Sequence, residues 1–256
     1  MIGIIGGTGF YNVDLFGEGE KITVETEYGN VEMLKGKYKD TEILFLPRHG
    51  FDHNRLAYLV SHHANLMAFK LMGVKRIIAT VAAGGLNPDY KSGDLVLIDQ
   101  FVSMHTYHTT YGKHSLDMTY PYCSELRNLF IEGAKELGYD MYPSGTYFSF
   151  DGPRYETAAE IRMYRQLGGD LVGQTNAPEA VLARELGICY SVVAMITNMA
   201  AGLSEDEPDL KTHSNVVKKN TEKIQNLLCL VATRIPSEHS CRCSEWHNRA
   251  VSARSK

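Results

Sequence analysis

The chain of 256 residues has no excess of basic side chains and no long apolar run. It carries 26 Lys and Arg against 30 Asp and Glu, a formal net charge of −4, which argues against a broad basic surface for nucleic acid or anionic lipid. No apolar run approaches the ~20 residues that span a bilayer. The first residues also lack the basic region of a secretion signal. We therefore expect a cytoplasmic protein without nucleic-acid or membrane partners.

Cysteine is scarce, with five residues in the chain. An odd number without a secretion signal indicates a reducing compartment. Cys123, Cys189 and Cys229 lie in apolar or mixed segments. We expect these three to behave as small hydrophobic side chains.

The last residues, 237–256, are polar and net basic, with little periodicity. We predict a tail or a partly ordered extension here, so that the main domain covers residues 1–236. Potential metal ligands gather in this segment: His239, Cys241, Cys243 and His247. The C-x-C spacing is tighter than the usual C-x₂₋₄-C of zinc sites. An inert tail is therefore favoured over a zinc site or a local or intersubunit disulfide, and we assign no metal.

Hydrophobic periodicity predicts strands alternating with helices. The predicted strands are Ile2–Ile5, Glu42–Leu46, Arg76–Thr80, Asp94–Asp99 and Cys189–Thr197. The predicted helices are Arg55–Met72, Glu125–Leu137, Thr157–Leu167, Ala177–Leu186 and Thr212–Thr233. Four of these helices are followed by a glycine that can end them: Gly73, Gly138, Gly168 and Gly187. This pattern indicates an α/β protein with a parallel or mixed sheet covered by helices.

Two loops that follow predicted strands carry donors for a tetrahedral anion. Gly6-Gly-Thr-Gly9 allows close approach of backbone N–H groups, and Thr8 adds a hydroxyl. Arg48 can make a forked contact to phosphate, and His49 can add a donor. A tight turn and a solvated loop are the structural alternatives.

Two further segments fit the same anion. Thr80-Val-Ala-Ala-Gly-Gly85 ends a strand with small residues. Gln174-Thr175-Asn176 precedes a helix start that has Pro178 in its first turn. Close packing and an ordinary helix cap are the structural alternatives. None of the four segments is decisive alone.

A dinucleotide-dependent oxidoreductase is a remote alternative, because a glycine turn follows the first strand. The G-x-G-x-x-G fingerprint fails, since Asn12 stands where the third glycine belongs. No Gly-Lys-Ser/Thr follows either, so the turn is not a Walker A loop.

Asp151-Gly-Pro-Arg-Tyr-Glu-Thr157 and Met195-Ile-Thr-Asn198 together offer groups that suit a purine. Tyr155 supplies a ring to stack on, Glu156 an acceptor for a ring N–H, and Asn198 an amide that donates and accepts. We predict that these two distant segments meet at one planar ligand.

From Met1 to about residue 235 the chain resembles the trimeric purine nucleoside phosphorylase and methylthioadenosine phosphorylase family. The matching segments are Gly6-Gly-Thr-Gly9, Pro47-Arg-His49, Asn65, Gly93-Asp-Leu-Val-Leu-Ile-Asp-Gln-Phe101, Gly152-Pro-Arg-Tyr155 and Pro178-Glu-Ala-Val-Leu-Ala-Arg-Glu185. The resemblance implies a single α/β domain around a mixed, partly barrel-like sheet. It also implies a homotrimer or a dimer of trimers, and no cofactor beyond phosphate as co-substrate.

The resemblance assigns roles by position. The implied phosphate site comprises Thr8, Arg48, His49, Ala82 and Thr175. Tyr155 is the implied aromatic wall against the base. Glu156 and Asn198 are the implied base readers, and Asn198 would stabilise the departing base.

Three positions bear on the substrate: Glu156, Asn198 and His213. Family members that prefer 6-aminopurines resemble each other in carrying aspartate where this chain has Asn198. An amide can donate to O6 or N7, so Asn198 favours inosine and guanosine. His213 aligns with a family histidine that binds a 5′-hydroxyl, although a helix-cap role is the alternative. A methylthioinosine or methylthioadenosine phosphorylase is the second interpretation. Gln174 and Val81 depart from the family, which has methionine against the ribose and often a hydroxyl donor to phosphate.

Overall fold

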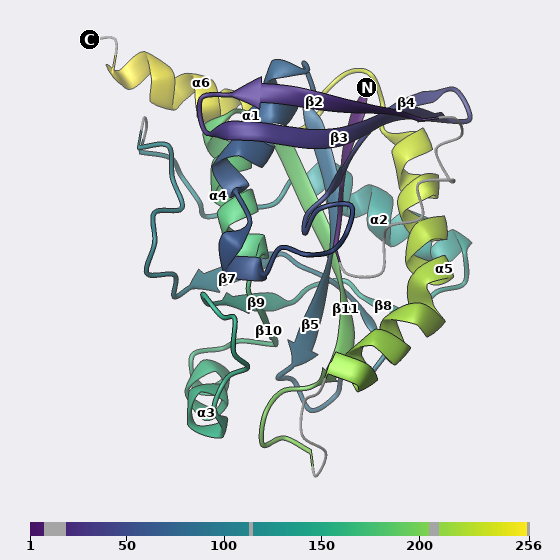
Figure 1. Ribbon diagram of the computed structural model, residues 1–256, viewed down its shortest axis with the longest axis vertical. Coiled ribbons are helices and arrows are strands. Elements are labelled where there is room, and N and C mark those ends of the chain that lie inside the picture. The colour runs from purple at the N-terminus through teal and green to yellow at the C-terminus, as the bar shows by residue number, and fades with distance from the viewer. Residues whose placement is uncertain (8–18, 113–114, 205–209, 255–256) are drawn as a thin grey trace.

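The computed structural model describes residues 1–7, 19–112, 115–204 and 210–254. Within these residues one mixed sheet of 11 strands forms the centre of the molecule (Figure 1). Its strands are β1 (Ile2–Gly6), β2 (Glu20–Thr26), β3 (Gly29–Tyr38), β4 (Thr41–Pro47), β5 (Arg76–Gly85), β6 (Leu95–Leu97), β7 (Gln100–Ser103), β8 (Met141–Tyr142), β9 (Thr146–Ser149), β10 (Leu171–Gly173) and β11 (Cys189–Met199).

Strand β5 organises the sheet because it pairs with three other strands. Its first half runs parallel to β1, its last residues pair antiparallel with β10, and β11 lies parallel along its length. β4 lies on the other side of β1, and β9 and β7 continue the sheet beyond β10. β1 and β4 end side by side next to the middle of β5, and β5 and β11 continue together to Gly85 and Met199. In sheets of this kind ligands bind beyond the carboxyl ends of the strands.

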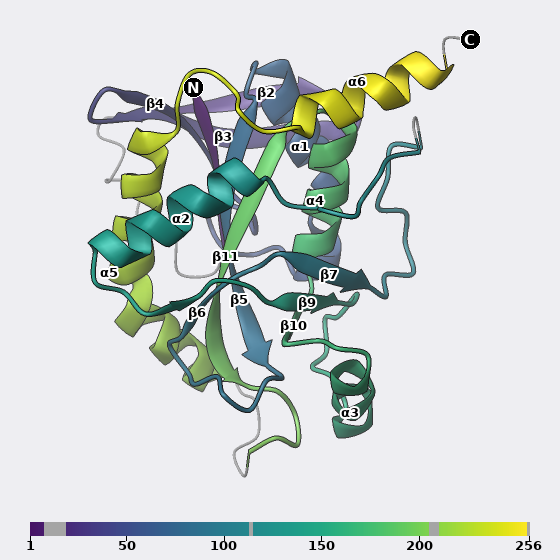
Figure 2. The same ribbon diagram turned by 180° about the vertical axis from the view of Figure 1, so that it is seen from behind.

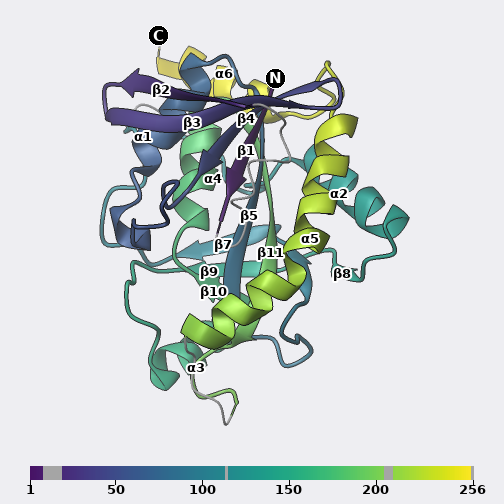
Figure 3. The same cartoon turned by 45° about the vertical axis from the view of Figure 1, so that its right-hand side comes forward.

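Two layers of helices cover the central strands. α1 (His62–Leu71) and α4 (Asn176–Glu185) pack together on one side, and α2 (Ser124–Glu136) and α5 (Leu210–Arg234) on the other (Figures 1 and 3). The long strands are buried on both faces and read as continuous apolar runs. α3 (Ala158–Gln166) lies apart, against β9, β10 and the turn after β11.

The sequence predicted this α/β architecture correctly, and the four glycines do end helices with positive φ between 67° and 86°. One helix was predicted too long. Arg55–Met72 is instead a 3₁₀ turn, η2 (Ala57–Leu59), followed by α1, which begins only at His62. The hairpin of β2 and β3 was missed, because its exposed charged residues dilute the alternating pattern.

The C-terminal segment also differs from its prediction. The structure has a helix, α6 (Cys243–Arg254), in the segment predicted as a tail or a partly ordered extension. Its first residue is 3% exposed and belongs to the apolar cluster under α2 and α5, and Trp246 packs against that cluster. Burial of α6 depends on contacts with distant residues, which a local pattern does not contain. The division of the chain at residue 236 stays a prediction.

Among the described helices, none combines the length and the apolar character needed to cross a membrane.

Candidate active site

The candidate site is built around a buried ion pair between Arg48, directly after β4, and Glu179 in the first turn of α4. Arg48 Nε donates to Glu179 Oε1 at 2.5 Å, and Nη2 donates to Oε2 at 2.9 Å. Nη1 donates to the carbonyl of Thr80 at 2.8 Å. Burial by itself would raise the pKa of Glu179, but the charge and hydrogen bonds of Arg48 hold that pKa below its usual value. The forked edge of Arg48, which the sequence assigned to phosphate, thus binds Glu179.

The glycine turn after β1 packs directly on this ion pair. A Cβ at Gly7 would lie 2.7 Å from Arg48 Nη1 and 2.7 Å from the carbonyl oxygen of Thr80. Only glycine fits so close an approach. The turn predicted as an anion cradle therefore also has a packing role. Its hydroxyl residue, Thr8, lies outside the described residues.

A buried chain of hydrogen bonds fixes the start of α4. The Tyr190 hydroxyl donates to Glu179 Oε2 at 2.7 Å, and Asn176 Nδ2 donates to the Tyr190 oxygen at 3.2 Å. The Tyr122 hydroxyl donates to Asn176 Oδ1. Such networks are rigid when their members are satisfied. The first turn of α4 is therefore held in place beside Arg48.

His49 borders the ion pair and is partly exposed. Its Nδ1 donates to the carbonyl of Arg55 at 2.9 Å, which directs the proton of the neutral ring to Nδ1. Burial, and then the charge of Arg48, lower the pKa of His49 to about 4, so the ring is neutral near pH 7. A phosphate dianion close to the ring would raise this pKa and favour a proton on Nε2.

Ala82 and Thr175 lie near the same ion pair. Ala82 follows Thr80 by two residues on β5 and is one of the partly exposed positions of that strand. Thr175 is the N-cap of α4, and its side chain makes no capping hydrogen bond. A helix N-terminus of this kind favours an anion, because its first N–H groups have no partner within the helix.

The segment that begins at Asp151 is tied to the loop after β7. Asp151 Oδ1 lies 2.8 Å from His105 Nδ1, and it accepts the backbone N–H of Thr106 at 3.2 Å. The second ring nitrogen of His105 lies 2.8 Å from Ser149 Oγ. These contacts fix one end of the predicted purine loop.

The other end of this loop is held by the start of α3. Thr157 and Glu160 form a reciprocal capping box, and Arg154 makes two hydrogen bonds of 2.8 and 2.7 Å to Glu160. Between these anchors Tyr155 is 39% exposed. Glu156 is partly buried, and this burial raises the pKa of its carboxyl group.

Gln174 lies along the backbone of the same loop. A Cβ at Gly152 would fall 2.1 Å from Gln174 Oε1, and Gln174 Nε2 donates to the Arg154 carbonyl at 3.4 Å. The sequence had placed Gln174 at the ribose. The structure gives it a contact with the loop that carries Tyr155 and Glu156.

Asn198 stands on a β-bulge of β11. The pairing of β11 with β5 shifts between Ile196 and Asn198, so that Thr197 is the extra residue. The Thr197 hydroxyl donates to Asn198 Oδ1 at 2.9 Å, and Asn198 Nδ2 donates to the Met199 carbonyl at 2.9 Å. Bulges next to active sites re-aim side chains. The carboxamide is thus oriented by its neighbours with its oxygen accepting.

The residues that follow the two predicted purine segments contact each other. A Cβ at Gly202, in the turn after β11, would lie 2.7 Å from the Cβ of Ala158, at the start of α3. Ala200 and Ile161 share one buried apolar cluster. Within the described residues no hydrogen bond joins Glu156 to Asn198, and the meeting of these two side chains at one ligand stays a prediction. His213 lies on α5, and its side chain is outside the described part.

Sequence reasoning missed Glu179 and His62 as parts of this site. Glu179 belongs to the segment Pro178-Glu-Ala-Val-Leu-Ala-Arg-Glu185, which carries part of the family resemblance. Nothing in the local sequence shows that it pairs with Arg48, 131 residues away. His62 is 3% exposed, its Nδ1 lies 3.9 Å from Glu179 Oε1, and neither ring nitrogen has a hydrogen-bond partner among the described residues. Burial lowers the pKa of His62 to about 3, with the charge of Glu179 acting in the opposite direction.

His62 should make the protein sensitive to acid. The unfolded chain binds a proton at this ring below pH 6.5, whereas the folded protein does so only near pH 3. The free energy of unfolding therefore falls as pH is lowered through this window, by up to about 1.4 kcal/mol per pH unit from one such group. We expect His62→Gln to flatten this slope in urea denaturation between pH 6.5 and 4.5. His63→Gln, at the partly exposed neighbour, is the control, and an equal slope in both variants would contradict the assignment.

Comparison with known proteins places this site in context. Residues 1–233 match the family model described as "Phosphorylase superfamily". The chain is 43% identical over 259 residues to a 6-oxopurine nucleoside phosphorylase of Pyrococcus furiosus, covering 95% of this chain and 96% of the relative. It is 45% identical over 252 residues to a Dictyoglomus turgidum protein described as "Probable 6-oxopurine nucleoside phosphorylase", covering 94% of each. The S-methyl-5′-thioadenosine phosphorylase of Pyrococcus furiosus is 40% identical over 251 residues, covering 95% of this chain and 96% of the relative.

The fold is also similar to solved structures. A methylthioadenosine phosphorylase from Schistosoma mansoni in complex with adenine superposes with a TM-score of 0.92, at 26% identity. The superposition covers 98% of this chain and 97% of the other. This chain therefore shares with the Schistosoma mansoni protein an α/β architecture around a large mixed sheet.

Proposed function

The chain belongs to the phosphorylase superfamily, and from this premise we propose that it cleaves 6-oxopurine nucleosides with phosphate. Inosine or guanosine would yield the free base and ribose 1-phosphate, a reaction of purine salvage. The observation that supports the choice of base is Asn198, an amide on the bulge of β11, a strand whose following turn contacts the start of α3. The 6-oxopurine relatives at 41–45% identity support the same choice.

The phosphate is proposed to lie among Arg48, His49, Ala82 and Thr175, with Thr8 completing the site. Nε and Nη2 of Arg48 bind the carboxylate of Glu179. Any hydrogen bond from Arg48 to phosphate would therefore come from the N–H groups of Nη1 and Nη2 that point away from Glu179. The N-terminus of α4 adds the favourable end of a helix dipole. The neutral ring of His49 becomes a donor as phosphate raises its pKa.

On the base side, Tyr155 would stack on the purine, and Gln174 and His213 would contact the sugar. Glu156 would accept the N1–H of a 6-oxopurine, which requires the ionised carboxylate. Burial raises the pKa of Glu156. As the pH falls, its carboxylate would therefore take up a proton, and lose this role, earlier than an exposed glutamate would. Asn198 would donate its second amide N–H to O6 or N7, since its first N–H binds Met199.

Catalysis follows from the charge that develops as the C1′–N9 bond breaks. The bonding pair leaves with the purine, and the sugar becomes an oxocarbenium-like cation. Phosphate stabilises this cation and forms the new C1′–O bond, and the purine anion takes a proton from water. Asn198 stabilises the anion through hydrogen bonds that strengthen as the bond lengthens. Arg48 and His49 keep the nucleophile in line. This route uses no covalent enzyme intermediate and no cofactor beyond the co-substrate phosphate.

We also propose a homotrimer, or a dimer of trimers, that works in the cytoplasm. The exposed apolar side chains of the loop after His49 support an interface there: Leu56, Tyr58 and Leu59 are 53%, 47% and 52% exposed. Three such side chains in one short segment form an apolar surface that a partner subunit could cover.

A nucleoside panel tests the proposal directly. Inosine, guanosine, adenosine and methylthioinosine are incubated with and without phosphate, and base release is measured. We expect inosine or guanosine to be cleaved at least about tenfold faster than adenosine, only with phosphate, because each mismatched hydrogen bond costs about 1–3 kcal/mol. Base release without phosphate, or a preference for adenosine, would refute it. Binding without turnover would identify a non-catalytic nucleoside-binding protein.

A 5′-methylthio substrate is the second candidate, favoured by the relatives that act on S-methyl-5′-thioadenosine at 37–40% identity. His213 separates the two candidates, since its imidazole would bind a 5′-hydroxyl. We expect His213→Val to lower kcat/KM for inosine by about tenfold more than for methylthioinosine, the value of one lost hydrogen bond. His63→Val serves as the control for a histidine outside the site. The opposite order would favour the methylthio substrate.

A further inference from the structure

Four of the five cysteines meet at one point, although they come from three distant parts of the chain. Cys123 directly precedes α2, Cys189 begins β11, and Cys241 and Cys243 stand at the start of α6. All four sulfur atoms lie within 4.8 Å of one another, and Cys189 and Cys241 are 3.3 Å apart. All are free thiols. The fifth cysteine, Cys229 on α5, is not part of this group, which we call the four-cysteine cluster.

The spacing of the four-cysteine cluster fits one tetrahedral ion. A Zn–S bond of about 2.3 Å places the sulfur atoms of a regular tetrahedron about 3.8 Å apart. The observed separations need only small side-chain rotations to reach that value. Four sulfur atoms so close leave space for a single ion, whereas an iron–sulfur cluster must fit several metal and sulfide atoms between its ligands. Thiolate ligands exclude Mg²⁺ and Ca²⁺, which require oxygen.

We propose that the four-cysteine cluster is a structural zinc site. Each thiol would lose its proton to solvent as its sulfur binds the ion, so binding releases up to four protons and needs no oxidant or reductant. Three of the ligands are buried and Cys241 is partly buried. Four protein ligands leave no coordination position for water or substrate, as in structural rather than catalytic zinc sites.

The surroundings suit the charge of such a site. Zinc with four thiolates carries a net charge of −2. Arg184 of α4 is 3% exposed, stacks 4.1 Å from the centre of the Trp246 ring, and has a buried Nη1 without a hydrogen-bond partner among the described residues. His239 Nδ1 lies 3.5 Å from Cys189 Sγ, where an N–H would donate to the thiolate. Groups that bind the ligands in this way orient them and balance their charge.

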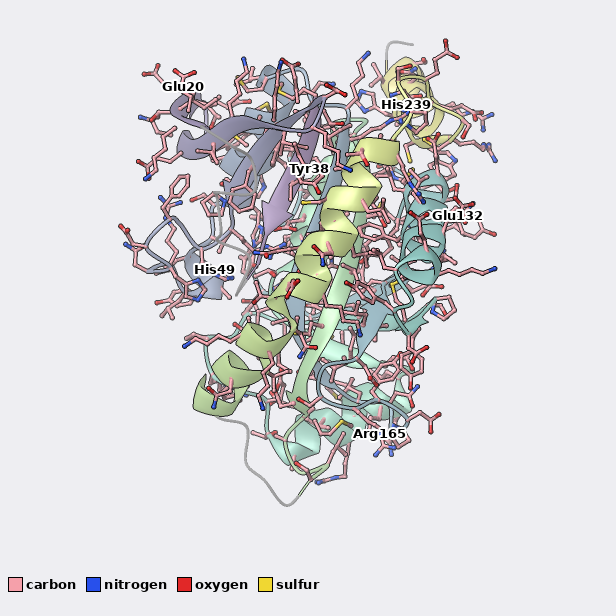
Figure 4. The ribbon with its side chains drawn as sticks, turned by 90° about the vertical axis from the view of Figure 1, so that its right-hand side faces the viewer. Glu20, Tyr38, His49, Glu132, Arg165 and His239 are labelled. Carbon is pink, nitrogen blue, oxygen red and sulfur yellow. The ribbon has the colours of Figure 1, made fainter. Side chains whose placement is uncertain are left out.

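The ion would join the C-terminal helix to the main domain. Figure 2 shows the start of α6 beside α4 and beside the N-terminal end of β11. Figure 4 shows His239 next to α6 and far from His49. An isolated helix of 12 residues is marginal in water. Within the described residues α6 has few buried side chains, so coordination of Cys241 and Cys243 would supply much of its attachment. The C-x-C spacing is then no obstacle, because the other two ligands come from other elements.

Metal analysis of the full-length protein tests the proposal. The chain is purified with a reductant and without chelator, then dialysed against metal-free buffer and analysed by inductively coupled plasma mass spectrometry. We expect about one zinc ion per chain in the wild type and less than about a tenth in Cys241→Ser. Cys229→Ser, a buried cysteine outside the four-cysteine cluster, should keep its zinc. Exchange with Co²⁺ should give the visible bands of a tetrahedral thiolate site in the wild type and in Cys229→Ser, but not in Cys241→Ser.

A second variant keeps the test decisive if Cys241→Ser folds poorly. Cys241→His would replace four cysteines by three cysteines and one histidine, which is also a zinc ligand set, so it should retain the ion. If the four cysteines instead formed two disulfides, both substitutions would break the one disulfide that contains Cys241, and the two variants would behave alike. Mass spectrometry after alkylation under non-reducing conditions counts the free thiols. Two disulfides without metal, stoichiometric iron, or zinc that survives Cys241→Ser would each overturn the proposal.

Discussion

Replacing Arg48 by alanine is expected to lower the free energy of unfolding by about 3–5 kcal/mol, because it leaves a buried carboxylate without its partner. Glu179 is 1% exposed, and among the described residues it would keep only the hydroxyl of Tyr190 as a hydrogen-bond donor. The phosphate KM should rise by more than about tenfold, since the lost charge and hydrogen bond amount to at least 1.4 kcal/mol. Urea denaturation gives the first quantity, and initial rates at varied phosphate give the second.

The chain offers a matched control for this prediction. Arg154 also makes two hydrogen bonds to a carboxylate, that of Glu160, but the two side chains are 58% and 28% exposed. Arg154→Ala should therefore cost at most about 1 kcal/mol of stability. Glu179→Gln keeps an acceptor for Tyr190 and should be destabilised while Arg48 is retained. An unchanged phosphate KM in Arg48→Ala, with the stability loss present, would restrict Arg48 to a structural role.

Replacing Asn198 by aspartate is expected to move the preference from inosine toward adenosine by about 100-fold in the ratio of kcat/KM, which corresponds to about 2.7 kcal/mol. In the proposed site the amide would donate to O6, whereas a carboxylate would repel O6 and accept from the 6-amino group. The change also sets a carboxylate oxygen against the carbonyl of Met199, where Asn198 Nδ2 now donates at 2.9 Å. Some loss of kcat on both substrates is therefore expected.

Two further variants separate recognition of the base from general damage. Asn198→Ala removes both functions of the amide and should lower kcat/KM for both nucleosides without inverting their order. Thr197→Val removes the hydroxyl that donates to Asn198 Oδ1 at 2.9 Å, and should weaken the preference for inosine without changing the phosphate KM. Equal losses on inosine and adenosine in Asn198→Asp would remove Asn198 from the role of base reader.

Local sequence signals predicted the elements that border the site. Apolar runs located the strands that end before Arg48, and the glycines located the ends of four helices. Thr8 lies outside the described residues, and the side chain of His213 is not described either. The roles predicted for these two residues therefore stay predictions. Glu179 could not be found in this way, because a carboxylate in the first turn of a helix is usually explained by the helix dipole alone.

The sequence by itself determined the α/β class and the loops that border the site, and it supplied the residue types on which the proposed choice among purines rests. These properties depend on periodicity and on chemistry that each residue carries. Only the tertiary structure decided which groups are partners: Glu179 for the fork of Arg48, and Cys123 and Cys189 for the two C-terminal cysteines. Such pairings join residues far apart in the chain. They are set by the register of β5 and β11 and by the packing of α4 and α6, which no short window of sequence contains.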